Sequence, residues 1–155
     1  MVLKFPGVEN NMFDTSRASD EGIGSRKKES SFWSCPGISF NGTNSGEDYQ
    51  DSGGNYICFS NQSLRVTIMG IPNGASIIKA FVSGITDAVE TWTLTRHNND
   101  GTGATTMATA NINSSDKTII EGFVDNNKYS YFIVTSLLNG ATEDAIESAR
   151  VDYTI

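Results

Sequence analysis

The stretch TWTLTRHNNDGTGATTMATANI, residues 91–112, decides the fold class of this chain. Its first part alternates strictly, so that Trp92 and Leu94 fall on one face of an extended strand and threonines fall on the other. Residues 98–101, Asn-Asn-Asp-Gly, are typical of a tight hairpin turn, because these residue types accept positive φ. A second strand follows at 105–112. The stretch therefore predicts an antiparallel hairpin with one buried face.

Strand patterns of the same kind recur on both sides of this hairpin, separated by segments rich in Gly, Asn, Ser and Asp. They are predicted at residues 56–59, 64–68, 77–83, 117–123, 129–137 and 145–155, with a broken first strand at 32–40 and a long loop at 41–55. About eight strands favour an all-β, two-sheet antiparallel sandwich with jelly-roll-like topology. Residues 141–149 overlap the start of the last predicted strand, and a single helical turn is the alternative for this segment. From the alternation, we expect the core between the sheets to hold Val66, Ile68, Val82, Trp92, Leu94, Phe132, Val134, Val151 and Tyr153.

Residues 1–30 differ from the rest of the chain in pattern and in charge. Their apolar residues, among them Leu3, Phe5, Phe13 and Ile23, follow no sustained period. The segment is electrically neutral, whereas residues 31–155 carry the whole net charge of −7. We interpret 1–30 as an extended arm and 31–155 as the sandwich domain. The basic run Arg26, Lys27 and Lys28 is either a solvated cluster or a contact to an acidic partner surface, such as another copy of the chain.

Patterns that carry catalysis or metal binding are weak in this sequence. His97 is the single histidine and lies at the hairpin turn, and no Gly-x-Ser-x-Gly elbow marks a nucleophile. A calcium loop beginning at Arg96 fails at its first position and at its twelfth, Met107. Cys35 and Cys58 are too few for a zinc site, and they are interpreted as free thiols or as one cross-strand disulfide. We expect no enzyme, no metal and no cofactor.

Charge and hydropathy restrict the partners. A net charge of −7 and a pI near 4.5 argue against nucleic acid. No stretch approaches the ~20 apolar residues of a membrane span, and the N-terminus lacks the apolar region of a secretory signal. We therefore expect a chain made and folded in a cytoplasm, without a membrane partner. The aromatic residues Trp33, Tyr49 and Tyr56, in or near the long loop, suggest a carbohydrate site as one alternative function.

From Leu64 to Thr154 the chain resembles a β-sandwich domain of uncharacterised, largely marine phage and bacterial proteins. The stretches that carry the resemblance are Gly70-Ile-Pro-Asn-Gly-Ala-Ser-Ile77, Glu90-Thr-Trp-Thr-Leu94, Thr106-Met-Ala108, Asn111-Ile-Asn-Ser114, Val124-Asp-Asn-Asn-Lys-Tyr-Ser-Tyr131 and Ala149-Arg-Val-Asp-Tyr-Thr154. Ile71 stands where the family has leucine, and Ser148 where it has glycine. The resemblance implies no catalytic residues.

Members of this family look like accessory virion or surface proteins. The resemblance thus implies a structural virion protein (a capsid decoration, spike or tail accessory protein), located in the virion and anchored to a capsid or other virion protein through its arm. By analogy it also implies a homo-oligomer, with a trimer favoured. The alternative is a carbohydrate-binding module of a surface or tail protein.

Overall fold

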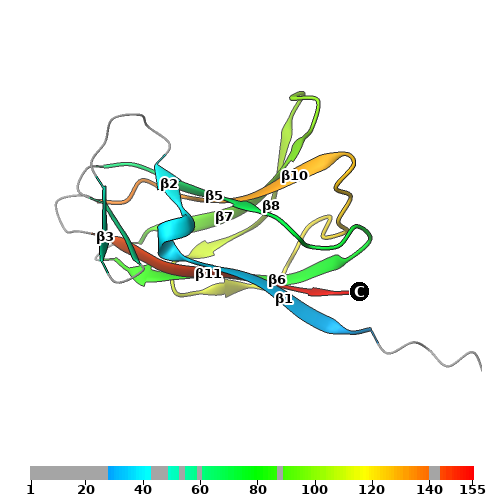
Figure 1. Ribbon diagram of the computed structural model, residues 1–155, viewed down its shortest axis with the longest axis horizontal. Helices are drawn as coiled ribbons and strands as arrows, with labels where there is room; N and C mark the ends of the chain where they lie inside the picture. Colours follow the sequence, from blue (N-terminus) through cyan, green and yellow to red (C-terminus); the bar gives the residue numbers. More distant parts are fainter. Residues whose placement is uncertain (1–27, 43–48, 53–54, 59–60, 87–88, 140–143) are drawn as a thin grey trace, which may run out of the picture.

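The computed structural model describes residues 28–42, 49–52, 55–58, 61–86, 89–139 and 144–155. These residues form two antiparallel sheets that lie face to face (Figure 1). One sheet contains β3 (Tyr49–Ser52), β4 (Asn55–Cys58), β11 (Ala145–Thr154), β6 (Ser76–Ile85) and β9 (Ser115–Asp116) in that order, with β1 (Ser30–Pro36) also paired to β11. The other sheet contains β2 (Asn41–Gly42), β5 (Leu64–Ile68), β10 (Tyr129–Thr135), β7 (Thr91–Asn98) and β8 (Ala104–Asn111).

The pairing confirms the β-sandwich and its jelly-roll-like topology. The first strand pairs with the last, β1 with β11, and the pairing then steps inward along the chain as β5 with β10, β6 with β9 and β7 with β8. Every one of these pairs is antiparallel, and successive pairs alternate between the two sheets. This is the arrangement of an eight-stranded jelly roll. Strands β2, β3 and β4 are additions inserted between β1 and β5.

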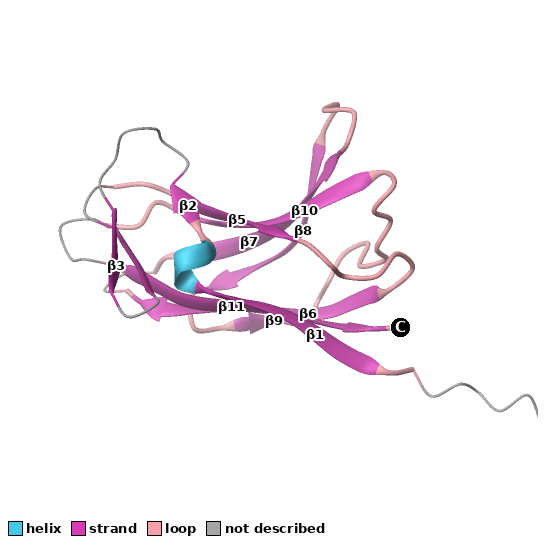
Figure 2. Ribbon diagram, viewed as in Figure 1, coloured by secondary structure: helices cyan, strands magenta, loops and turns pink. Residues whose placement is uncertain are grey.

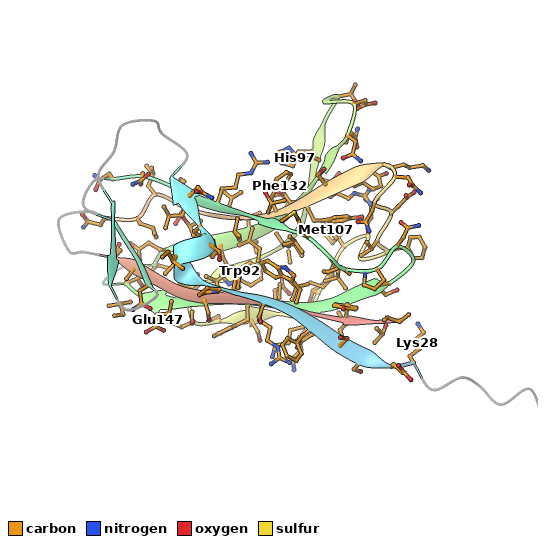
Figure 3. The ribbon with its side chains drawn as sticks, in the orientation of Figure 1. Lys28, Trp92, His97, Met107, Phe132 and Glu147 are labelled. Atoms are coloured by element: carbon orange, nitrogen blue, oxygen red, sulfur yellow. The ribbon has the colours of Figure 1, made fainter. Side chains whose placement is uncertain are left out.

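The predicted core is confirmed at most of its positions. Val66, Ile68, Val82, Trp92, Leu94, Val151 and Tyr153 are all buried between the sheets. Figure 3 shows Trp92 and Met107 in this interior.

Phe132 and Val134 were predicted for the wrong face of β10. Both are half-buried, whereas their neighbours Tyr131, Ile133 and Thr135 are buried. Apolar residues occupy both faces of this strand, so alternation alone does not choose between them. The choice is made by the neighbouring strands, because the Arg65 guanidinium covers the outer face of Phe132 at 3.6 Å from the ring centroid.

The predicted strand at 117–123 is also wrong. After the short β9, this segment turns at Ile120 and Glu121, and Glu121 takes a positive φ of 52°. The turn begins at Asp116, whose carboxylate accepts a hydrogen bond from the Thr118 N–H at 2.7 Å. Local side-chain bonding of this kind competes with a strand ladder.

One further segment differs from expectation, and another confirms the predicted last strand. The loop predicted at 41–55 contains β2 and β3, and a 3₁₀ turn at Gly37–Ser39 precedes it (Figure 2). The strand predicted at 145–155 is confirmed as β11, so the alternative of a helical turn is wrong for residues 145–149.

Candidate binding surfaces

The predicted arm contacts lie almost entirely outside the described residues. Leu3, Phe5, Phe13, Ile23, Arg26 and Lys27 belong to that undescribed part. Lys28 is described; it is exposed and lies two residues before the start of β1 (Figure 3).

The three aromatic residues predicted for sugar binding do not form one described platform. Trp33 is half-buried and packs against the core, so only part of its ring is open to a ligand. Tyr49 and Tyr56 lie on the β3–β4 hairpin, where Tyr56 pairs with Ile146 of β11. Trp33 pairs with Val151, which lies five residues from Ile146 along β11. The pairing positions of Trp33 and Tyr56 on β11 are therefore about 17 Å apart.

Strand β1 has a free outer edge. The Ile155 N–H donates to the Glu29 carbonyl over 3.0 Å, which continues the β1–β11 register by one bonded pair. Bonded and non-bonded pairs alternate in an antiparallel ladder, so every second residue of β1 turns its backbone groups away from β11. No hydrogen bond among the described residues uses these groups, which belong to Ser30, Phe32 and Ser34.

The opposite side of the sandwich has its edges covered. The outer edge of β6 is capped by Asn113, whose N–H donates to the Val82 carbonyl over 2.8 Å. The Asn113 side chain also accepts from the Gly84 N–H at 3.0 Å and donates to the Gly84 carbonyl at 2.8 Å. On β8, the Met107 carbonyl accepts a hydrogen bond from the Ile120 N–H at 2.9 Å. The other side of the described sandwich holds β1, β5 and the short β3, which pairs only with β4, and we call it the open side.

The outer face beside β1 combines aromatic and charged groups. Phe32 is 54% exposed, and the Arg150 guanidinium lies 4.2 Å from its ring centroid. Arg150 also pairs with Asp152 at 2.5 Å. A shallow depression of about 510 Å³ extends from these residues to Pro36 and Glu147.

A second depression lies between the two sheets on the open side. It has a volume of about 440 Å³, and Trp33, Cys35, Val66 and Met69 are among its lining residues. Cys35 is a free thiol, and burial raises its pKa to about 11 although a hydrogen bond from the Ala149 backbone acts in the opposite direction. The thiol is therefore protonated and weakly nucleophilic at neutral pH.

A polar site lies at the end of the sandwich where β7 meets β8. Tyr129 borders two depressions there, of about 340 and 570 Å³. The smaller one is lined by amide, carboxylate and ammonium groups of Asn98, Asn99, Asp100, Asn127 and Lys128. Its two loops are bonded to each other, since the Asn99 N–H donates to the Lys128 carbonyl at 2.8 Å and the Ser130 hydroxyl donates to Asn99 Oδ1 at 2.6 Å. The alternation of strands does not reveal this site, because its two loops come together only when β10 pairs with β7.

His97 of β7 lies beside Phe132 of β10. Its ring packs edge-on against Phe132 with a centroid distance of 4.9 Å (Figure 3). Within the described ranges, no group of three or more His, Cys, Asp or Glu residues is placed to hold a metal ion. The same ranges contain no helix with the length and hydropathy needed to cross a membrane.

No protein-family model matches the chain. No curated protein matches it either.

Proposed function

We propose that this chain is a non-enzymatic structural protein of a phage virion, anchored through its N-terminal arm as a capsid decoration, spike or tail accessory protein. The observation that supports this best is the way the arm joins the domain. The basic run ends at Lys28, and the uncovered edge strand β1 begins two residues later at Ser30. A partner that binds the arm thus reaches an open strand edge directly, and edge strands are common places for another chain to add.

Three further considerations agree with this proposal. Jelly rolls are a common architecture of viral capsid domains, which is an analogy at the level of the fold. The sequence from Leu64 onward also resembles a family whose members look like virion or surface proteins. The acidic surface expected from the net charge of residues 31–155 suits a basic arm contact between neighbouring subunits.

Two experiments test the proposal. Sequencing the DNA that flanks the gene should find capsid, portal or tail genes beside it. The purified chain should then co-sediment stoichiometrically with particles of that phage from which this gene has been deleted. A variant with Arg26, Lys27 and Lys28 replaced by Glu should lose that binding and keep the melting temperature of the parent. Failure of the parent chain to bind such particles would rule out the virion role.

A carbohydrate-binding module is the second candidate function, and the polar site around Tyr129 favours it. Sugar sites combine an aromatic ring with amide and carboxylate groups, and the pocket at Asn98–Asp100 offers these groups on two mutually bonded loops. Saturation-transfer NMR against a glycan panel would test it. Loss of binding in Asp100→Asn and Asn127→Ala would place the sugar at this end. Loss in Trp33→Ala, Tyr49→Ala or Tyr56→Ala would place it at the end predicted from the sequence.

A further inference from the structure

The free edge of β1 has a composition that edge strands usually avoid. Proteins protect open edges with charged residues, proline or bulges. From Ser30 to Cys35 the strand carries no charge, and proline comes only at Pro36. By comparison, β5, the other strand on the open side, is covered by β2 at Leu64 and Arg65. Thus β1 is the longer and less protected of the two edges.

The chemistry of this edge is complementary to itself. Lys28 lies at one end of β1 and Glu147 lies beside the other end, next to Ser148, which pairs with Pro36. Figure 3 shows the two charged residues toward opposite ends of this sheet. Glu29 follows Lys28 but falls on the opposite face of the extended chain. When such an edge meets a second copy in the antiparallel direction, Lys28 of each copy therefore comes beside Glu147 of the other.

We propose that two copies of the chain pair through β1, antiparallel across a two-fold axis at Phe32, so that their sheets become one continuous sheet. The occupant of the edge is therefore a second copy of this chain. The proposal goes beyond the virion role and does not depend on it: in the dimer the second copy takes the β1 edge, and the virion partner then binds the arm alone. A strand edge that pairs antiparallel with itself closes at two copies, so the assembly differs from the trimer that the sequence resemblance implies.

The backbone selects one register. The outward N–H groups belong to Ser30, Phe32 and Ser34, because Pro36 has none. All three donors find a carbonyl when Phe32 faces Phe32 of the second copy and Ser30 faces Ser34. Shifting the register by two residues toward Pro36 leaves the Ser30 carbonyl without a donor, because Pro36 has no N–H. Shifting it the other way places Ser34 opposite Lys28, which lies outside β1.

The side chains agree with this register. The two Phe32 rings meet at the axis on the outer face, and each is flanked by its own Arg150. Lys28 comes opposite Pro36 of the second copy, one further strand spacing of about 4.8 Å from Ser148. From there the Lys28 ammonium reaches the exposed carboxylate of Glu147 in the second copy, and symmetry creates this ion pair twice.

Sedimentation equilibrium over a concentration series tests the dimer directly. The full-length chain should approach twice its mass of 16.7 kDa. Phe32→Lys places two ammonium groups at the axis and should weaken association by about 100-fold or more. Ile120→Lys is the matched control, because Ile120 is similarly exposed at 58% and lies on the covered side of the sandwich. This control should dimerise like the parent.

The charge pair gives a second, reciprocal test. Lys28→Glu and Glu147→Lys should each weaken the dimer by roughly tenfold, since each change turns two attractions into repulsions. The double variant should restore association to near the parent level. A purely structural effect of either change would not be reversed by the other.

Disulfide trapping fixes the register. In a chain with Cys35 and Cys58 replaced by Ser, Phe32→Cys should form a covalent dimer under mild oxidation, because this residue faces itself and antiparallel Cα separations fall in the range a disulfide accepts. Ser34→Cys alone should not cross-link, but mixed with Ser30→Cys it should. A chain that stays monomeric up to about 1 mM overturns the proposal. Only association with a binding free energy weaker than about 4 kcal/mol would escape detection at that concentration. An oligomer that is insensitive to Phe32→Lys and not trapped at residue 32 also overturns the proposal, while leaving an arm-mediated virion role intact.

Discussion

The indole Nε1 of Trp92 donates a hydrogen bond to the Ser114 carbonyl over 3.0 Å. Trp92 is fully buried on β7, and Ser114 directly precedes β9 in the other sheet. This bond therefore ties the two sheets together beside the hairpin whose sequence decides the fold. It also satisfies the one polar atom of the largest buried side chain.

Replacing Trp92 with alanine should destabilise the domain by about 3–5 kcal/mol, because it leaves a large cavity between the sheets. Trp92→Phe keeps most of the apolar contact but loses the bond to Ser114, and it should cost less, about 1–2 kcal/mol. Urea unfolding followed by circular dichroism measures both values. A Trp92→Ala variant as stable as the parent would contradict the central position of this residue.

Asn113 bonds the outer edge of β6, and its contribution to the free energy of unfolding has two parts. Its φ of 67° is costly for alanine, and its side chain bonds both backbone groups of Gly84. Asn113→Ala should lose both contributions, about 2–4 kcal/mol. Asn113→Gly removes the bonds without the strain and should lose about 1–2 kcal/mol. Equal losses in chemical denaturation would show that the backbone conformation contributes nothing.

The sequence was sufficient to predict the sandwich because most strands carry their apolar residues on one face. Trp92 and Leu94 are examples, since threonines occupy the other face of that strand and leave no ambiguity. The jelly-roll-like topology was also predicted from about eight strands, although β2, β3 and β9 were not among them. The alternation did not predict the turn within 117–123, where the Asp116 carboxylate accepts a hydrogen bond from the Thr118 N–H and the strand ladder ends.

The binding surfaces were harder to predict, for a physical reason. The importance of Phe32 depends on β1 being an edge strand, which is a property of strand order and not of local pattern. Tyr129 forms a site only because two loops distant in sequence are bonded together through Asn99 and Lys128. Neither relationship leaves a periodic signal in the sequence.

The face assignment on β10 leads to a stability prediction. Ile133 is fully buried, so Ile133→Ala should cost about 2–5 kcal/mol. Phe132 lies on the outer face against Arg65 and His97, so Phe132→Ala should cost less, about 1–2 kcal/mol, despite the larger side chain. The two variants are compared by urea denaturation under one condition. The reverse order of stabilities would return Phe132 to the core.

The raised pKa of Cys35 predicts slow alkylation. Only the thiolate reacts, and burial moves the pKa from its ordinary value of 9.0 to about 11. In a Cys58→Ser variant, the rate of modification by iodoacetamide should be low at neutral pH and should rise steeply only toward pH 11. A rate profile that levels off near pH 9 would show that the folded domain does not protect this thiol.

The same burial makes stability depend on pH in one direction. The folded-state pKa of Cys35 lies above the ordinary value of 9.0, so the folded chain holds this proton when the unfolded chain has released it. The resulting stabilisation is complete below about pH 9 and is lost as the pH rises toward about 11. Replacing Cys35 with Ser removes this dependence, whereas lysine and tyrosine titrations remain common to both chains. Between about pH 9 and pH 11, the unfolding free energy of the parent should therefore fall relative to that of Cys35→Ser. A difference that stays constant between pH 8.5 and pH 11 would contradict a buried thiol.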